Sequence, residues 1–235
     1  MGSAVHDLPL GTIVGLGCIA QSCEKCHNCT HGSDNFCSET KFTYFGNVTD
    51  ETGSYPHRGG FSSYVRTPAS KLLRIPSSLT PEEAGPLMCA GVTTFTPLYE
   101  WTGKTCRAEG KTIGILGIGG LGHLAIQYAA KMGADDVVVF SRTADKESLA
   151  RQLGATKFVV TSDEEQMKAQ ASTLDYLMVC ISGGSFDPSL YFPLFRPYGT
   201  IHLVGIPESQ INISVMGPFL MKRLSISASP VGSTV

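Results

Sequence analysis

The stretch KTIGILGIGGLGHLAIQYAAKMGADDVVVFSR, residues 111–142, decides the fold of this 235-residue chain. A short apolar run over 113–116 leads into the pattern GxGxxG, whose glycines are Gly117, Gly119 and Gly122. Apolar residues then recur at helical spacing as far as Met132, and a second apolar run covers 137–140. A lone GxGxxG is a weak signal, but its position between a strand and an amphipathic helix predicts a dinucleotide-binding turn.

Each glycine of this turn has a separate physical role. The first makes the tight turn, the second lets the backbone approach a pyrophosphate, and the third lets helix and strand pack closely. The diphosphate then lies at the helix N-terminus, where unpaired N–H groups point at it. The alternative is a glycine-rich turn without a ligand. The cofactor contacts expected here are Gly117, Gly119, Gly120, Leu121 and Gly122.

The end of the second strand favours one dinucleotide over the other. An NAD site needs Asp or Glu about 20 residues beyond the motif, where it accepts from the ribose 2′-hydroxyl. That place holds Ser141 and Arg142, with Lys146 one turn later, and the first carboxylate comes only at Asp145. A hydroxyl and two cations suit a 2′-phosphate, which predicts NADP(H). The alternative is an ordinary solvated strand end.

Further apolar runs extend the same pattern to the C-terminal part of the chain. They alternate with helical segments and cover residues 157–160, 175–181, 200–206 and 224–229. Strands that are apolar along their whole length are typical of parallel sheets covered on both faces. The sequence therefore predicts an α/β protein with a doubly wound parallel sheet.

A second pattern, CEKCHNCTHGSDNFC at residues 23–37, holds four thiols at the spacing CxxCxxCx7C. Four thiolates complete the tetrahedron that zinc prefers, so a closed structural Zn²⁺ site is predicted at Cys23, Cys26, Cys29 and Cys37. The alternatives are a pair of disulfides or an iron–sulfur cluster. His27 and His31 are expected to be solvated, because four thiolates leave no open position.

Composition excludes several classes of function. The net charge of −2 gives no electrostatic attraction to nucleic acid. No apolar run approaches the roughly 18 residues of a spanning helix, and the first residues lack the pattern of a secretory signal. A cytoplasmic, reducing location is the expectation. The other four cysteines, Cys18, Cys89, Cys106 and Cys180, are scattered through apolar segments.

A helix is predicted to begin at Thr80 and to carry Cys89. Thr80 is a good N-cap, Pro81 suits the first helical position, and Glu83 completes a capping box. Cys89 lies two turns in. Composition alone favours the interpretation of Cys89 as a small buried core residue.

Taken together and in this order, four motifs resemble the zinc-dependent medium-chain alcohol dehydrogenases. They are the thiol loop, GGF at 59–61, PLMCAGVTT at 86–94 and GIGGLGH at 117–123. The closest branch looks like the NADP-dependent cinnamyl-alcohol dehydrogenase type. The resemblance implies a partial GroES-like, mainly-β catalytic domain over 1–108 and a Rossmann-like domain over 109–235. It also implies hydride transfer between a small alcohol or aldehyde and NADP(H), in a homodimer.

The resemblance also assigns roles to single residues. Cys89 matches a ligand of the catalytic zinc, and Thr93 matches a threonine at the nicotinamide. Ser141, Arg142 and Lys146 match the 2′-phosphate site. The remaining matches are to the carboxamide and the nicotinamide surroundings: Val204, Gly205, Ile206 and Ser229.

Two catalytic-zinc ligands of that family have no match in this sequence. They are an N-terminal cysteine and the histidine of a GHE motif. The resemblance therefore implies an incomplete catalytic site and a chain shortened at both ends. One alternative function is an inactive fragment that binds zinc and NADP. A zinc-free reductase of the same superfamily is the other, although such proteins lack the thiol loop.

Overall fold

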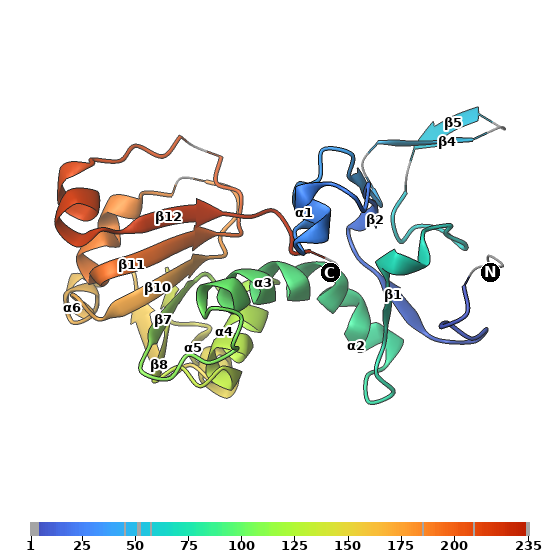
Figure 1. Ribbon diagram of the computed structural model, residues 1–235. Coiled ribbons are helices and arrows are strands. Elements are labelled where there is room, and N and C mark those ends of the chain that lie inside the picture. The colour runs from blue at the N-terminus through green and yellow to red at the C-terminus, as the bar shows by residue number, and fades with distance from the viewer. Residues whose placement is uncertain are drawn as a thin grey trace. The chain divides into compact units, whose positions relative to one another are not determined.

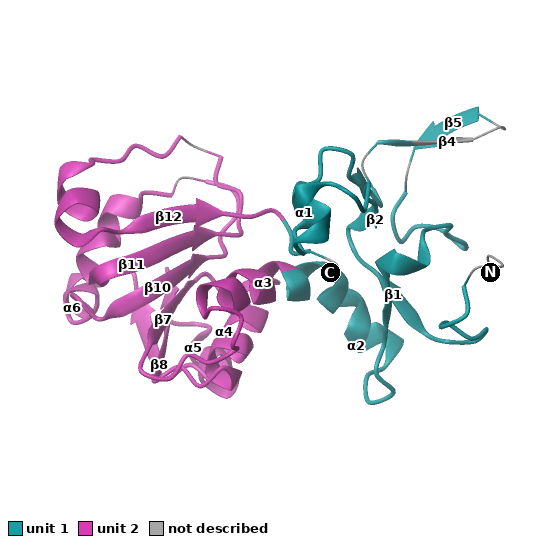
Figure 2. Cartoon of the chain, viewed as in Figure 1, with its two compact units in different colours: residues 1–92, 231–235 teal, residues 93–230 magenta. Residues whose placement is uncertain are grey.

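The computed structural model describes residues 5–44, 46–50, 53–56, 58–184, 186–208 and 210–233 (Figure 1). The chain forms two compact units. The first contains Met1–Val92 and Val231–Val235, and the second contains Thr93–Pro230 (Figure 2). The boundary predicted at residue 108 lies further along the chain than the boundary between these units, and it remains a prediction for the domains.

A six-stranded parallel sheet forms the centre of the second unit. Its strands are β7 (Thr112–Leu116), β8 (Asp136–Ser141), β9 (Lys157–Val160), β10 (Leu174–Val179), β11 (Phe195–Leu203) and β12 (Ser225–Ala228). Their order across the sheet is β9-β8-β7-β10-β11-β12, and every neighbouring pair is parallel. Counted from β7 this is the dinucleotide-binding order, with its reversal between β7 and β10. The predicted doubly wound sheet is confirmed.

One helix of the second unit, α3 (Val92–Trp101), precedes β7, and the other helical segments follow strands of the sheet. They are α4 (Gly122–Lys131), α5 (Glu147–Gln152), α6 (Glu164–Lys168), the 3₁₀ turns Pro188–Leu190 and Phe192–Leu194, and the π-helix Met216–Met221. None of the helices in the described part of the chain is long and apolar enough to cross a membrane.

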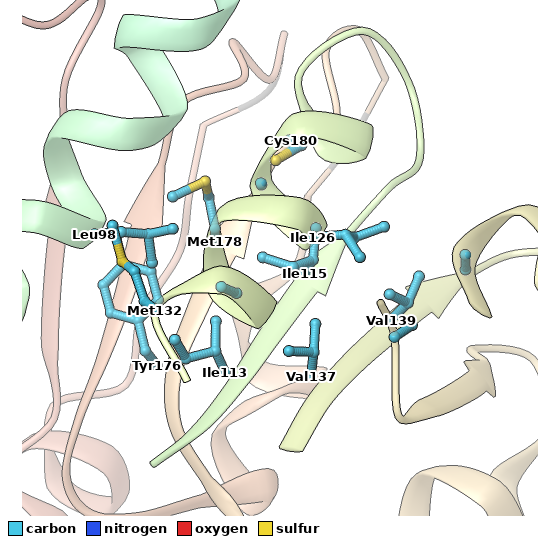
Figure 3. Packing of buried hydrophobic residues seen from close by; sticks show 14 of the residues in the cluster. Leu98, Ile113, Ile115, Ile126, Met132, Val137, Val139, Tyr176, Met178 and Cys180 are labelled. Carbon is cyan, nitrogen blue, oxygen red and sulfur yellow. The ribbon is translucent and has the colours of Figure 1, made fainter. Parts of the chain in front are cut away.

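Both faces of the sheet are buried, which explains the near-continuous apolar strands. On one face, residues such as Ile113, Val139 and Met178 pack with Ala125 and Ile126 of α4 (Figure 3). Their neighbours along the strands pack into a second cluster on the other face, which includes Val138, Phe140, Leu177 and Val179. Two faces of apolar burial supply the main stabilisation of this unit.

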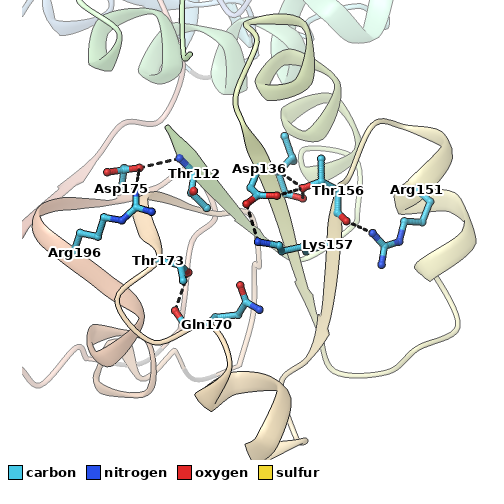
Figure 4. Close-up of polar contacts among 10 residues, drawn as sticks. Thr112, Asp136, Arg151, Thr156, Lys157, Gln170, Thr173, Asp175 and Arg196 are labelled. Atoms are coloured by element: carbon cyan, nitrogen blue, oxygen red, sulfur yellow. Dashed lines mark hydrogen bonds and ion pairs between the residues drawn. The ribbon is translucent and has the colours of Figure 1, made fainter. Parts of the chain in front are cut away.

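Polar contacts hold the amino ends of the same strands (Figure 4). Asp175 Oδ2 accepts from the backbone N–H of Thr112 at 2.8 Å and from Arg196 at 3.1 Å. Asp136 accepts from Lys157 at 2.7 Å. These contacts lie at the edge opposite to the carboxyl ends, where ligands of open α/β sheets bind.

The first unit is built from antiparallel strand pairs. The pairs are β1 (Val14–Leu16) with β6 (Leu72–Arg74), β2 (Ile19–Gln21) with β3 (Lys41–Phe42), and β4 (Asn47–Asp50) with β5 (Gly53–Pro56). Its helical segments are α1 (His27–Thr30), the 3₁₀ turns Asp34–Phe36 and Ala69–Lys71, α2 (Pro81–Pro86) and the π-helix Leu87–Gly91.

The helix expected after Thr80 is present, but it is not regular. The hydroxyl of Thr80 accepts from the N–H of Glu83 at 3.2 Å, and the Glu83 carboxylate accepts from the N–H of Thr80 at 2.9 Å, which confirms the capping box. After Pro86 the backbone widens into the π-helix, and Cys89 lies on this turn. Single π turns of this kind often occur at functional sites.

Candidate functional site

The glycine turn lies at the carboxyl end of β7, beside the reversal of strand order. The N–H of Gly117 donates to Phe140 O at 3.0 Å, and its φ of 93° is in the region that favours glycine. A Cβ on Gly117 would lie 2.7 Å from Cγ2 of Ile181, and one on Gly122 would lie 1.9 Å from the carbonyl oxygen of Gly117. The close packing expected of the third glycine is therefore present.

The opposite side of the turn is open. A Cβ on Gly119 or Gly120 would meet no atom within 4 Å among the described residues, so the backbone leaves room for a ligand there. Leu121 is the N-cap of the ten-residue helix α4, and its side chain forms no capping bond. Of the first N–H groups of α4, those of His123 and Leu124 donate to Gly119 O and Leu121 O, each at 3.1 Å. The helix start therefore offers an anion chiefly the positive end of the helix dipole. His123 Nδ1 contacts Gly119 O at 3.1 Å.

The end of β8 brings one cation to the glycine turn. Lys146 Nζ donates to Ile118 O at 3.2 Å, although the two residues are 28 positions apart. Ser141 is half-buried, and Arg142 is exposed. Asp145 accepts a hydrogen bond from Thr143, and this bond together with Lys146 lowers the pKa of its carboxyl. Two cations and one carboxylate therefore surround this strand end, consistent with a site for a 2′-phosphate.

The ends of β10 and β11 approach each other closely. A Cβ on Gly205 would lie 1.9 Å from Ile181 O. The N–H groups of Val204 and Gly205 both donate to Val179 O, at 3.1 and 3.0 Å. The N–H of Ile206 donates to Ser182 Oγ at 3.3 Å. These amides are engaged, and the carbonyl of Ile206 accepts from the N–H of Gly183 at 3.1 Å.

Two hydroxyls predicted to lie at the nicotinamide belong to the second unit. Thr93 is 3% exposed, and its Oγ1 has no hydrogen-bond partner among the described residues. A buried hydroxyl without a partner is uncommon, and a bound ligand can satisfy it. Ser229 Oγ contacts His202 Nε2 at 2.9 Å. The residues present thus fit a dinucleotide.

The four predicted zinc ligands come together in the first unit. The sulfurs of Cys23, Cys26, Cys29 and Cys37 all lie within 4.8 Å of one another. Sγ of Cys29 is 3.9 Å from that of Cys23 and 3.6 Å from that of Cys26. A zinc tetrahedron with bonds of about 2.3 Å places its sulfurs about 3.8 Å apart, so this group fits the ion.

Contacts within the thiol loop move the thiol pKa values in both directions. The backbone N–H of Cys29 lowers the pKa of Cys26, but desolvation and the neighbouring thiols of the loop outweigh it and raise this pKa to about 11. The backbone N–H groups of Cys23 and Glu39 stabilise the negative sulfur of Cys37 and lower its pKa to about 6. All eight cysteines are free, so the structure gives no support to a pair of disulfides. His31 contacts its own helix through His27 O at 2.8 Å, and neither loop histidine belongs to the sulfur group.

A buried ion pair fixes this loop, and sequence reasoning missed it. Lys71 Nζ lies 2.6 Å from Asp34 Oδ2, and the two side chains are 2% and 0% exposed. Ser233 Oγ donates to the other carboxylate oxygen at 2.6 Å, and Asn35 Nδ2 donates to Val231 O at 2.9 Å. No local pattern announces these contacts, because the partners lie up to 199 residues apart.

Cys89 has a neighbour that sequence reasoning also missed. Cys89 is exposed. A hydrogen bond joins its thiol to the thiol of Cys18. The thiol of Cys18 is also hydrogen-bonded to the hydroxyl of Tyr44. The two thiols are close because the backbone segments that precede them are close: a Cβ on Gly17 would lie 3.0 Å from Met88 O. Partial burial of its sulfur and the adjacent Cys18 raise the pKa of Cys89 to about 11.

This pair does not complete a catalytic metal site. Catalytic zinc takes three protein ligands and one open position. Within the part of the chain that the structure describes, the thiol loop is the only group of three or more His, Cys, Asp or Glu residues placed to hold a metal. The residues described around Cys89 therefore do not fit the catalytic zinc that the resemblance implies.

Comparison with known proteins gives concordant results for both units. The family described as alcohol dehydrogenase GroES-like domain matches residues 1–77, and the family described as zinc-binding dehydrogenase matches residues 120–235. The NADP-dependent alcohol dehydrogenase C 1 of Mycolicibacterium smegmatis is 34% identical over 232 residues, covering 99% of this chain and 64% of that protein. The chain thus spans about two thirds of the length of this relative.

Two solved structures agree with this assignment. A cinnamyl alcohol dehydrogenase from Sorghum bicolor superposes with a TM-score of 0.86 at 32% identity. One from Helicobacter pylori, complexed with NADP(H), gives 0.83 at 30% identity. In each case 99% of this chain and 64% of the known chain are covered. The GroES-like first part and the Rossmann-like second part are thereby confirmed, and the chain belongs to the zinc-binding alcohol dehydrogenase family.

Proposed function

We propose that this chain binds NADP(H) and zinc and belongs to an oxidoreductase that interconverts alcohols and aldehydes by hydride transfer. One observation carries the cofactor assignment: the ammonium of Lys146 reaches the carbonyl of Ile118 inside the glycine turn. This contact supports a cation close to the glycine turn after the β8 end, the segment in which an NAD site has a carboxylate for the ribose 2′-hydroxyl. The NADP-dependent relative from M. smegmatis supports the same preference.

Each part of the site has a separate task in binding. The N-terminus of α4 faces the diphosphate, while Ser141, Arg142 and Lys146 hold the 2′-phosphate. The hydroxyl of Thr93 and the carbonyls of Val204–Ile206 orient the nicotinamide half. When bound, NADP(H) supplies or accepts the hydride, and the protein fixes the position of the reacting carbon. The thiol loop stabilises the first unit, since a four-thiolate zinc has no open position.

A titration with two cofactors tests the proposal. Wild-type protein should bind NADPH more tightly than NADH. Arg142→Ala and Lys146→Ala should each weaken NADPH by about tenfold or more, because charge-assisted contacts are worth about 1.5–3 kcal/mol, and should barely affect NADH. Lys168→Ala, a cation on α6 paired with Glu164 and Glu165, is the matched control. Equal or tighter binding of NADH by the wild type contradicts the assignment.

A second candidate is a zinc- and NADP(H)-binding part of such an enzyme that does not turn over by itself. The described surroundings of Cys89, with Cys18 as its thiol neighbour, favour this candidate. The 235 residues should then bind one zinc and oxidise NADPH negligibly with cinnamaldehyde or benzaldehyde. Two zinc ions per chain together with rapid turnover would decide for the complete enzyme.

We further propose a cytoplasmic homodimer that acts on a small alcohol or aldehyde. The free thiols of the zinc loop suit a reducing compartment. β12 forms an edge of the six-stranded sheet, and the family resemblance suggests pairing there. Sedimentation equilibrium tests the dimer: a monomer at micromolar concentration speaks against it.

A further inference from the structure

A histidine on β11 connects two serines of β12. His202 pairs with Ser227 in the register of the two parallel strands. Its Nδ1 lies 2.8 Å from Ser227 Oγ, and its Nε2 lies 2.9 Å from Ser229 Oγ. The imidazole is 8% exposed, so both ring nitrogens are satisfied by hydroxyls in a nearly buried place.

His202 is a polar residue on a sheet face that is otherwise largely apolar. Met178 of β10, which pairs with His202, belongs to the apolar cluster under α4. A buried polar ring in such surroundings costs free energy unless its hydrogen bonds are made. A leucine there would need no partners. The two hydroxyl partners therefore make His202 more than a space-filling residue.

A neutral imidazole restricts the hydroxyls that it touches. One ring nitrogen donates and the other accepts, so one serine receives a hydrogen bond and the other donates one. Burial lowers the pKa of His202 to about 4, which keeps the ring neutral at physiological pH. Ser229 Oγ is then held in one direction instead of rotating freely.

Ser229 lies at the ligand edge of the sheet. Its N–H donates to Leu203 O at 3.2 Å, at the point where β11 runs into Val204 and Gly205. Carboxyl ends of parallel strands form the binding edge, and Gly117 ends β7 at that edge. We propose that His202 is a positioning residue that fixes the hydroxyl of Ser229 toward the nicotinamide half of the cofactor. This inference rests on the proposed NADP(H) binding.

Two ligands separate this role from a general effect on folding. NADPH contains the nicotinamide half, whereas adenosine 2′,5′-bisphosphate has the 2′-phosphate and adenosine without nicotinamide. The 235-residue chain is titrated with both ligands, as wild type and as His202→Leu, His202→Gln and Ser225→Ala. Ser225→Ala is the control, because it removes a β12 hydroxyl that lies two residues before Ser227 and pairs with Thr200.

We expect His202→Leu to weaken NADPH about three- to tenfold, the range of one lost hydrogen bond, and to reduce the fluorescence change of bound NADPH. The bisphosphate should keep its affinity within about twofold. His202→Gln, which retains one donor and one acceptor, should restore part of the NADPH affinity, and Ser225→Ala should match the wild type.

Equal losses for both ligands would show that His202 serves the fold alone, and unchanged NADPH binding by His202→Leu would also overturn the inference. If the wild type binds neither ligand, the proposed cofactor function itself fails and the inference fails with it. If the wild type binds both ligands and only the variant pattern is absent, the cofactor function stands and the role of His202 does not.

Discussion

Two lysine–aspartate pairs of nearly equal length differ sharply in burial. Lys71 and Asp34 are 2.6 Å apart and almost fully buried, whereas Lys157 and Asp136 are 2.7 Å apart with side chains 44% and 29% exposed. Water screens the second pair, and such pairs contribute about 0–1 kcal/mol. Removing one partner of a buried pair leaves an uncompensated charge in the interior, which costs about 3–5 kcal/mol.

We therefore expect Lys71→Met to lower the local unfolding free energy of the thiol loop by about 3–5 kcal/mol. Native-state hydrogen exchange of peptides spanning the loop measures this change. Lys157→Met is the matched control, and exchange around β8 and β9 should change by less than about 1 kcal/mol. Similar effects of the two variants would show that burial does not determine the contribution of these pairs.

The buried imidazole of His202 predicts a dependence of stability on pH. Its pKa is about 4 in the folded chain, against an ordinary value of 6.5. Between these values the unfolded chain binds a proton that the folded chain does not, so stability falls as the pH is lowered from about 6.5 to 4. The loss is at most about 3 kcal/mol. Tyr176, the titratable ring stacked beside His202, stays neutral because burial raises its pKa.

Trp101, the only tryptophan of the chain, reports on this unit because its ring lies 4.8 Å from that of Tyr176. Urea unfolding followed by tryptophan fluorescence should show that the unfolding free energy falls as the pH is lowered from 6.5 to 4. In His202→Leu, the unfolding free energy should depend less steeply on pH. An unchanged slope in that variant would assign the dependence to other groups.

At the scale of elements, the glycine turn joins the fold to the ligand site. A Cβ on Gly122 would lie 1.9 Å from the backbone oxygen of Gly117, whereas one on Gly119 meets nothing within 4 Å in the described structure. Alanine at a helical position normally gains about 1 kcal/mol over glycine. At Gly122 the clash with backbone exceeds this gain, since overpacking costs about 1–3 kcal/mol and a backbone oxygen moves less easily than a side chain.

We expect Gly122→Ala to lower the unfolding free energy of the second unit by about 2 kcal/mol and Gly119→Ala to change it by less than about 0.5 kcal/mol. Gly119→Ala should instead weaken NADPH about tenfold, because its methyl group enters the space proposed for the diphosphate. Thermal unfolding and NADPH titration of both variants measure the two effects. Tight NADPH binding by Gly119→Ala would place the diphosphate elsewhere.

The elements that the sequence predicted well are those whose cause is local. The capping box of Thr80 and Glu83 needs only residues three apart, and it is present. Other features depend on partners that are distant in sequence. β11 begins at Phe195, although the stretch FRPYG has the proline and glycine of a turn, because parallel pairing with Leu174 of β10 extends it. The π-helix at Cys89 was likewise not predicted by the spacing of its apolar residues.

At the scale of the whole molecule, the same rule separates predictable from unpredictable parts of the site. The glycine turn and the four thiols are each encoded within fifteen residues or fewer, and the structure brings each group together. The meeting of Cys18 with Cys89 and of Asp34 with Lys71 and Ser233 arises only from the folded backbone. Sequence spacing therefore predicted which thiols and glycines come together, and the structure was needed to find the residues that support them. The ligands of these groups remain a prediction.

The last prediction concerns the independence of the two units. The zinc loop belongs entirely to the first unit, whereas the parallel sheet of the second has apolar clusters on both of its faces. Metal that binds only the folded loop stabilises only the structure coupled to it. Removal of zinc should therefore loosen the first unit and leave the nucleotide-binding sheet intact.

Metal analysis of the purified chain should give one zinc bound by the thiol loop. After chelation, or in Cys26→Ser, hydrogen exchange should rise across residues 18–43, while NADPH affinity and the unfolding followed by Trp101 fluorescence stay within error of the wild type. Cys106→Ser, a half-buried thiol outside the loop, is the control and should keep the metal. A parallel loss of zinc and NADPH binding would show instead that the thiol loop supports the cofactor site, so that the two units act as one cooperative structure.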